Sequence, residues 1–190
     1  VSILGAGAAG LFSALEILKK QAIELHLFDL NPYPGRKLAI TGSGRGNLTN
    51  LNQFDAAYRS STCSNVRRTF QLFNPQSLCE IFEQLGIPTL ATDDGWVYPI
   101  SNAAANVAHT LVQHVQARGA IVHSGVKITR IFYGSDRKFT LQSDDGERFD
   151  KADALLVASG SCASPQVGAD DAILSELRKM GIEVIPFKPA

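Results

Sequence analysis

The sequence predicts an α/β fold with a parallel sheet, and three features predict it. A short apolar strand at the start of the chain runs into a glycine-rich turn and an amphipathic helix. A second apolar strand follows that helix, as in a strand–helix–strand unit. Further along, short segments between Gly/Asp turns indicate an antiparallel three-stranded β-meander. Together these features predict a Rossmann-like domain of parallel sheet, helices and meander.

The first strand and its turn occupy residues 1–10, Val-Ser-Ile-Leu-Gly-Ala-Gly-Ala-Ala-Gly, and contain the pattern G-x-G-x-x-G. In this pattern Gly5 permits a tight turn, Gly7 lets the backbone approach a pyrophosphate, and Gly10 lets the next helix pack on the sheet. The N–H groups and positive dipole at the start of that helix favour phosphate. The turn therefore predicts dinucleotide binding.

The second strand, residues 23–28, leads into Asp29. This acid follows Gly5 by about 24 positions, near the roughly 20 residues at which Rossmann units place a carboxylate that accepts hydrogen bonds from ribose. We therefore expect Asp29 to bind a ribose. NADP is disfavoured at this site because residues 30–32 offer no basic side chain for a 2′-phosphate.

The next segment, residues 31–50, is rich in glycine, basic and hydroxyl-bearing residues and lacks helical periodicity. Glycines free the backbone to form anion-binding concavities, while arginine and lysine offset phosphate charge. Amides and hydroxyls suit a polyhydroxylated chain or a ring edge. A solvated loop is the alternative interpretation. The candidate binding residues are Gly35, Arg36, Lys37, Thr41, Gly42, Gly44, Arg45 and Asn47.

Two helices are predicted in the middle of the chain. An Asn-Pro start and a terminal glycine bound the first, over residues 74–86. The second covers residues 103–118, and a short strand at 120–123 follows it. The strand–helix–strand unit thus carries a long insertion, residues 31–102. Asp93-Asp94 in this insertion is interpreted as a turn, so no metal site is predicted.

The meander is predicted over residues 126–150, with turns at 134–136 and 144–146. Residues 154–160 then form an apolar strand that ends in a glycine turn, as a strand buried in a parallel sheet does. A meander in place of a crossover helix favours FAD over NAD. An ordinary NAD-dependent dehydrogenase of Rossmann type is the alternative.

Composition narrows the function further. The 190 residues include 18 Lys or Arg and 18 Asp or Glu, so no net charge attracts nucleic acid. No segment approaches the roughly 20 apolar residues of a membrane span. Cys63, Cys79 and Cys162 are far apart and form no C-x-x-C pair, which predicts reduced thiols and a cytoplasmic location. Composition does not predict the oligomeric state.

The segment Gly35-Arg-Lys-Leu-Ala-Ile-Thr-Gly-Ser-Gly-Arg-Gly-Asn-Leu-Thr-Asn50 is long and unusual. It resembles the motif G-R-K-x-x-x-(S/T)-G-x-G-R-C-N-x-T-N of the BaiN-like flavoproteins, also called aminoacetone-oxidase-like NAD(P)/FAD-dependent oxidoreductases. Gly95-Trp-Val-Tyr-Pro-Ile-Ser101 is similar to the family's G-R-x-F-P-x-S. Ala158-Ser-Gly160, with Pro165 and Gly168, is similar to A-T-G-G-x-S-x-P-x-x-G.

The chain departs from these motifs in places. Gly46 stands where the family has Cys, and Trp96 where it has Arg. Ser159 and Ser161 alter the A-T-G-G turn.

The resemblance implies an FAD-dependent oxidoreductase that transfers hydride through the flavin to or from a small organic substrate, with NAD(P)H as the candidate donor. It implies an FAD-binding domain over residues 1–181 and the start of a second, mostly absent substrate domain at 182–190. The residues implied to bind FAD or to lie beside it are Gly5, Gly7, Ala8, Ala9, Gly10, Asp29, Leu30, Gly35, Arg36, Lys37, Thr41, Gly42, Gly44, Arg45, Asn47, Leu48, Val126, Ala158, Ser159 and Gly160.

No catalytic residue is predicted, because a flavin supplies the redox chemistry itself. The histidines, His26, His109, His114 and His123, are interpreted as structural or surface residues, since their spacing does not suit metal ligation. Cys162 follows the Gly160 turn, but no resolving cysteine accompanies it. A nucleotide-binding module that senses or scaffolds without turnover is the third hypothesis.

Overall fold

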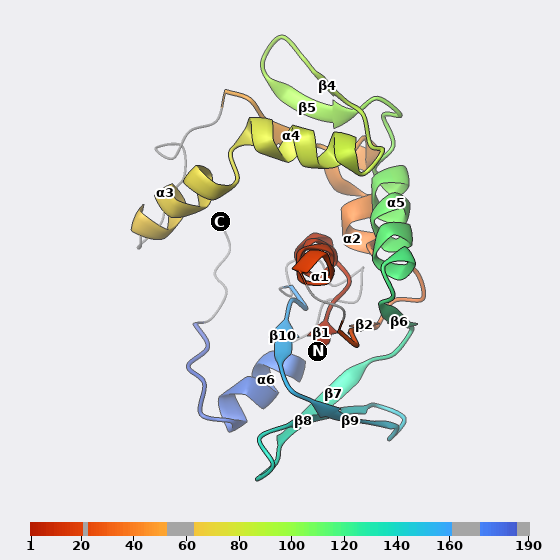
Figure 1. Cartoon of the computed structure of the whole chain (residues 1–190), viewed down its shortest axis with the longest axis vertical. Helices are drawn as coiled ribbons and strands as arrows, with labels where there is room; N and C mark the ends of the chain where they lie inside the picture. The colour runs from red at the N-terminus through yellow and green to blue at the C-terminus, as the bar shows by residue number, and fades with distance from the viewer. Residues whose placement is uncertain (21–22, 53–62, 161–171, 186–190) are drawn as a thin grey trace. The chain divides into compact units, whose positions relative to one another are not determined.

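The computed structural model describes residues 1–20, 23–52, 63–160 and 172–185, and it has a Rossmann-like α/β fold (Figure 1). The chain divides into two compact units. Unit 1 comprises residues 1–37 and 111–190, and unit 2 comprises residues 38–110. The boundaries fall within two helices, α2 (Arg36–Ala39) and α5 (Ala104–Ala117).

Unit 1 is built on a parallel sheet. Among the described residues its strands lie in the order β10-β1-β2-β6, and every neighbouring pair is parallel. Helix α1 lies between β1 and β2 in the chain, which confirms the predicted strand–helix–strand unit. The bounds are β1 Ser2–Leu4, α1 Ala8–Lys20, β2 His26–Asp29, β6 Ile121–Ser124 and β10 Leu155–Val157.

Two of these strands differ from their predictions. Strand β2 begins at His26 rather than at residue 23, because its pairing with β1 begins where His26 lies opposite Ser2. Strand β10 was expected to be buried on both faces, but Leu156 is 36% exposed. In the part of the sheet that the structure describes, β10 pairs with β1 alone, so its outer side has less cover.

The predicted antiparallel meander is confirmed. Over the described residues its strands lie in the order β7-β8-β9, with bounds β7 Ile128–Tyr133, β8 Phe139–Ser143 and β9 Arg148–Ala152. Left-handed backbone at Arg137 and Gly146 reverses the chain at its two turns. Helix α6 (Ala172–Lys179), which the sequence analysis did not predict, packs against β7 (Figure 1).

The two faces of the parallel sheet have different neighbours. Side chains alternate along a strand, so Ile3 and Leu4 point to opposite faces. Ile3 lies under α1, where its Cγ2 atom is 3.5 Å from the position that a Cβ on Gly10 would take. Leu4 and Phe28 belong to a core shared with the meander and α6, whose other buried members are Ile128, Ile131, Leu141 and Ile173.

Glu176 connects α6 to β7. Its side chain is buried, and Oε2 accepts a hydrogen bond from the backbone N–H of Ile131 at 3.3 Å. Oε1 accepts a hydrogen bond from Lys179 Nζ at 2.6 Å, and this bond is the main cause that lowers the pKa of Glu176. The charged carboxylate therefore satisfies a strand N–H that faces away from β8.

Unit 2 contains a small antiparallel sheet and helices. Within the described residues its strands lie in the order β3-β5-β4, with bounds β3 Thr49–Asn50, β4 Thr89–Ala91 and β5 Trp96–Pro99. Helix α4 (Pro75–Gln84) begins as predicted, since Asn74 Oδ1 accepts the N–H of Ser77 at 2.8 Å. Helix α3 (Cys63–Leu72), β3 and β4 were not predicted.

Residues 31–50 show no helical periodicity in the sequence, but the structure forms two short helical turns in them. Helix α2 forms at Arg36–Ala39, and a 3₁₀ turn, η1, follows at Thr41–Gly44. These single turns are too short to leave an apolar periodicity in the sequence.

None of the helices within the described ranges is long and apolar enough to cross a membrane.

The burial pattern predicts how much stability each sheet loses when a leucine side chain is shortened to alanine. Leu141 in β8 is fully buried in the shared core, whereas Leu156 in β10 is partly exposed. We expect Leu141→Ala to lower the free energy of unfolding by about 2–5 kcal/mol, because it leaves a cavity, and Leu156→Ala to cost under about 1.5 kcal/mol. Chemical denaturation of both variants measures the difference. Equal losses would contradict the assignment of Leu141 to this core.

Candidate functional site

The turn after β1 is closed around two of its glycines. Gly5 has a φ of 100°, and a Cβ placed on it would lie 2.4 Å from the carbonyl oxygen of Ala158. A Cβ on Gly10 would lie 1.8 Å from the carbonyl oxygen of Gly5. Both distances are far shorter than any real contact, so neither position accepts a side chain. The turn therefore lies directly against the segment after β10 and against the first turn of α1.

Gly7 is different from its neighbours. A Cβ placed on Gly7 would meet no atom within 4 Å, and its φ is not in the left-handed region. Ala8 and Ala9, which begin α1, are exposed. The first N–H groups of a helix have no intrahelical partner. The residues present thus provide open space and backbone donors where a pyrophosphate would approach, so the fold fits such a group.

Asp29 lies at the end of β2, beside this turn, and is only 9% exposed. Its Oδ2 accepts the N–H of Ala6 at 2.8 Å, and its Oδ1 accepts the backbone N–H of Asn31 at 2.8 Å and the Asn31 side-chain amide at 3.0 Å. A carboxylate has about four lone-pair sites. Asp29 therefore fixes two turns and retains capacity for about one further donor.

The chain beyond Asp29 is also held by the backbone. The N–H of Val126 donates to the Asp29 carbonyl at 2.9 Å, and the Gly125 N–H donates to the Asn31 carbonyl at 3.0 Å. Leu30, between them, is 36% exposed. The structure thus brings Val126 next to Asp29, although 97 positions of sequence separate them.

The remaining candidates of unit 1 lie around the start of α2 or after β10. Arg36 and Lys37 are exposed at the start of α2, and Arg36 Nη1 donates to Asn31 Oδ1 at 3.3 Å. Gly35 is buried with a φ of 78°.

The segment after β10 is held beside the glycine turn. The Ala158 N–H donates to the Leu4 carbonyl at 2.7 Å, which holds Ala158 and Ser159 against the Gly5 turn. Gly160 follows with a φ of 79°. Ser161, Cys162, Pro165 and Gly168 lie outside the described residues.

In unit 2, the glycine-rich segment closes on itself. Gly42 and Ser43 are both left-handed, with φ values of 56° and 57°. The N–H groups of Gly44, Arg45 and Gly46 donate to the carbonyls of Ile40, Gly42 and Thr41 at 3.0–3.3 Å. These donors are engaged within the turn rather than directed at an anion, which changes the interpretation of the segment as a backbone concavity. These three N–H groups would not bind an anion at this turn.

The other candidates of unit 2 continue this segment. Thr41 Oγ1 donates to the Leu38 carbonyl at 2.8 Å. A Cβ on Gly42 would lie 2.9 Å from the Asn47 nitrogen, so this left-handed glycine packs against Asn47. The Leu48 N–H donates to the Val97 carbonyl at 2.9 Å and ties the segment to β5. The side chain of Arg45 is exposed.

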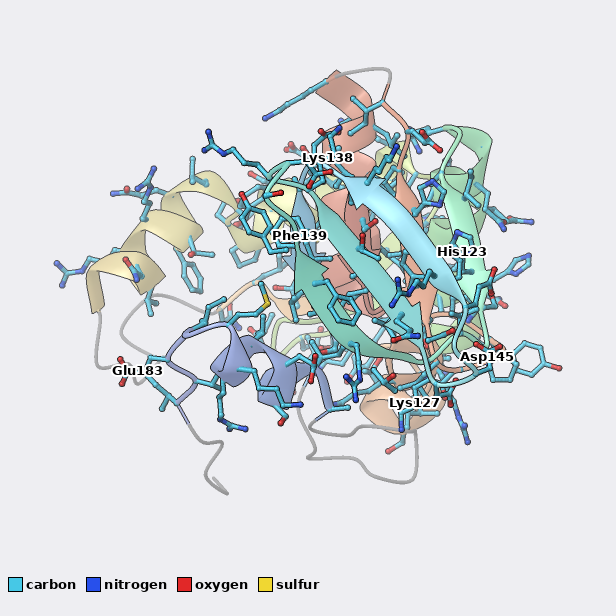
Figure 2. All side chains as sticks on the ribbon, turned by 90° about the horizontal axis from the view of Figure 1, so that it is seen from below. His123, Lys127, Lys138, Phe139, Asp145 and Glu183 are labelled. Atoms are coloured by element: carbon cyan, nitrogen blue, oxygen red, sulfur yellow. The ribbon has the colours of Figure 1, made fainter. Side chains whose placement is uncertain are left out.

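A histidine pair was missed by the sequence analysis. His26 Nδ1 lies 2.9 Å from His123 Nε2, and His26 Nε2 lies 3.0 Å from Glu24 Oε1. His123 also stacks on Phe28 and meets the edge of Phe149 in β9, and Figure 2 shows it beside the meander. The register of β2 and β6 brings the two histidines together, and no local pattern encodes that register.

No metal centre is present among the described residues, since no group of three or more His, Cys, Asp and Glu side chains converges in them.

Burial lowers the pKa of His123, and the neighbouring His26 lowers it further, while Glu147 opposes both.

Comparisons with known proteins agree with the Rossmann-like fold. Residues 1–188 match a family model described as HI0933-like protein Rossmann domain. The chain is 28% identical over 191 aligned positions, its whole length, to a 3-dehydro-bile acid delta(4,6)-reductase of Clostridium scindens, of which it covers 46%. It is 28% identical over 187 positions, 97% of the chain, to a ribosomal RNA dihydrouridine synthase of Haemophilus influenzae, again covering 46%. The chain therefore spans less than half the length of these curated relatives.

Among solved structures, Thermovibrio ammonificans THI4 is similar to the chain with a TM-score of 0.63 at 15% identity. The match covers 96% of this chain and 62% of that one. At this level of identity the likeness shows a shared fold.

The histidine pair predicts a pH dependence of stability. Because the pKa of His123 is lowered in the folded protein, acid protonates the unfolded chain first, starting near pH 6.5. The free energy of unfolding should fall as the pH drops from about 7 towards the lowered folded pKa. His123→Phe keeps an aromatic ring between Phe28 and Phe149 but cannot titrate, so its stability should fall less over this range. Denaturation at stepped pH measures both slopes, and identical slopes would refute the prediction.

Proposed function

Because the match over residues 1–188 makes the chain a member of the HI0933-like family, we propose that the protein is an FAD-dependent oxidoreductase. The observation that carries the proposal is the turn after β1. Gly5 and Gly10 are packed too closely for any side chain, whereas Gly7 borders open space at the start of α1. This combination supports binding of a dinucleotide pyrophosphate.

Unit 1 supplies backbone and side-chain contacts to the proposed cofactor. The N–H groups at the start of α1 bind the pyrophosphate, and Asp29 uses its remaining acceptor capacity for a ribose hydroxyl. The N–H of Val126 donates to the Asp29 carbonyl, so Val126 would lie near the adenine end of a dinucleotide whose ribose is bound by Asp29. The proposed contacts of unit 1 are Gly5, Gly7, Ala8, Ala9, Gly10, Asp29, Leu30, Gly35, Arg36, Lys37, Val126, Ala158, Ser159 and Gly160.

Unit 2 supplies side chains and a further positive charge. Three backbone N–H groups of its turn donate hydrogen bonds within the turn. We therefore propose the side chain of Arg45 as the group of this turn that binds an anion. The proposed contacts of unit 2 are Thr41, Gly42, Gly44, Arg45, Asn47 and Leu48.

Bound FAD would supply hydride transfer, which needs no particular catalytic side chain. The chain's own residues bind the cofactor and hold its adenosine end through backbone and carboxylate groups. The names of the relatives favour reduction as the direction. One relative is a reductase of a bile acid, and dihydrouridine, the product named for the other, is uridine with two added hydrogens.

We propose a small organic molecule as the substrate and NAD(P)H as the electron donor. The balance of 18 basic and 18 acidic residues favours a small molecule over an RNA, although one relative acts on ribosomal RNA. Turnover assays with NADH or NADPH against unsaturated ring compounds and against ribosomal RNA distinguish these classes.

We also propose that residues 1–181 act as the FAD-binding domain and that residues 182–190 begin a substrate domain. The length of the relatives supports a longer protein, since each is more than twice the matched region. A cytoplasmic location agrees with Cys79, which is a free cysteine.

The absorption spectrum of the natively purified protein tests the proposal most directly. We expect flavin absorption bands, and FAD in the supernatant after heat denaturation. A colourless protein that takes up no FAD on reconstitution would refute FAD binding. Tight NAD binding without FAD would instead support an ordinary dehydrogenase, and bound flavin that no donor reduces would support a sensing module.

A substitution at Gly7 separates binding from folding. Gly7→Ala places its methyl group in open space on an ordinary backbone, so the melting temperature should stay within about 2 °C of the wild type. The same methyl group would occupy the space of the pyrophosphate. It should lower the affinity for FAD at least about tenfold, or by about 1.4 kcal/mol in binding free energy.

Gly10→Ala is the matched control, because its methyl group clashes with the Gly5 carbonyl and should destabilise the fold itself. FAD titration and thermal melting of both variants give the answer. Wild-type FAD affinity in Gly7→Ala would show that the pyrophosphate does not lie at this turn.

A further inference from the structure

The guanidinium of Arg45 in unit 2 is held by two side chains. Its central carbon lies 4.3 Å from the centroid of the Tyr98 ring, within the range of a cation–π interaction. Its Nε donates a hydrogen bond to Asn102 Oδ1 at 3.2 Å. One face and one edge of the guanidinium are therefore fixed by residues outside the glycine-rich segment.

The backbones that carry these side chains are fixed as well. The Arg45 N–H donates to the Gly42 carbonyl at 3.1 Å. Gly46 is buried with a φ of 83°, and a Cβ on it would lie 3.1 Å from the Ala104 Cα and 3.3 Å from Pro99 Cδ. Asn102 has a φ of 49°, and its N–H donates to the Pro99 carbonyl at 2.8 Å. The Arg45 side chain thus extends from a tightly packed segment of backbone.

Among the described residues, the terminal amino groups of Arg45 have no anionic partner. In the described part of the chain, no carboxylate pairs with Arg45, and its side chain interacts with the Tyr98 ring and with Asn102 Oδ1. The amino groups of a guanidinium form a fork that matches a phosphate or carboxylate. An arginine that is fixed in this way, with no carboxylate partner in the described ranges, is suited to a ligand anion.

The geometry points to Tyr98 and Asn102 as positioning residues that hold Arg45 to bind the phosphate groups of the cofactor. This inference rests on the proposed function, because it takes FAD as the ligand. Tyr98 restricts the guanidinium plane by stacking, and Asn102 fixes its rotation through Nε. Both residues act on the ligand through Arg45, so neither needs to touch it.

The test measures FAD affinity by titration in four variants of the protein. Arg45→Met removes the charge and should weaken FAD by roughly ten- to a hundredfold. Tyr98→Leu removes the ring face, and Asn102→Gly removes the acceptor while a glycine keeps the left-handed backbone. Each of these two should weaken FAD by about three- to tenfold. Tyr98→Phe keeps the ring face and should stay within about twofold of the wild type.

Riboflavin, which carries no phosphate, is the matched ligand. The same variants should bind riboflavin as the wild type does. Wild-type FAD affinity in Arg45→Met would overturn the inference. Equal losses for FAD and riboflavin would overturn it too, since they would show an effect on the ring or the fold rather than on phosphate.

A second readout does not depend on FAD. The NMR signal of the Arg45 Nε–H should be protected from exchange in the wild type and in Tyr98→Phe, and exposed in Asn102→Gly. Titration with inorganic pyrophosphate should shift this signal in the wild type and less in Tyr98→Leu. If the wild type binds no FAD, the proposed function fails, and the pyrophosphate titration then tests the anion site by itself. A shift of the Arg45 signal would support the role of Tyr98 and Asn102 in holding Arg45 for an anion. No shift would overturn it.

Discussion

The carboxylate of Asp29 is the interaction on which the candidate site depends. It accepts the N–H of Ala6, which is fully buried and would otherwise lack a partner at a cost of about 1–3 kcal/mol. It also accepts the N–H of Asn31 and so closes the turn after β2. The backbone carbonyls of Asp29 and Asn31 accept hydrogen bonds from the N–H groups of Val126 and Gly125. The Asp29 carboxylate thus joins the glycine turn to the end of β2, and the Asp29 backbone carbonyl joins the same place to the entry of the meander. Together they fix the backbone that a dinucleotide would meet.

The meander gives the parallel sheet a second buried face without a crossover helix. Phe28 reaches from β2 into the core that the meander and α6 share. Because β7 has a strand neighbour on one side only among the described strands, its outward N–H at Ile131 needs another acceptor, and Glu176 of α6 provides it. The helix therefore completes the layer through hydrogen bonding as well as through apolar burial.

Features encoded within a few residues were predictable from the sequence. The Gly5 turn and the helix capped by Asn74 follow from local backbone and capping chemistry, and the structure has both. Features that depend on distant pairing were not predictable. Strands β3 and β4 exist through their pairing with β5, and β2 starts where β1 offers a partner. The stacking of Arg45 on Tyr98 belongs to the same class, since 53 positions separate the two residues.

The glycines of the two units serve different physical purposes. In unit 1 they allow close packing at Gly5 and Gly10 and leave open space at Gly7, so the donors at the start of α1 face outward. In unit 2 they let a left-handed turn form that uses its own N–H groups, as at Gly44 and Gly46. An anion at the Gly7 turn would therefore be bound by uncharged backbone dipoles, and one at the glycine-rich turn of unit 2 by the charge of Arg45. Because salt screens an exposed charge more strongly than it affects short hydrogen bonds, the contribution of Arg45 should be more sensitive to ionic strength than that of the Gly7 turn.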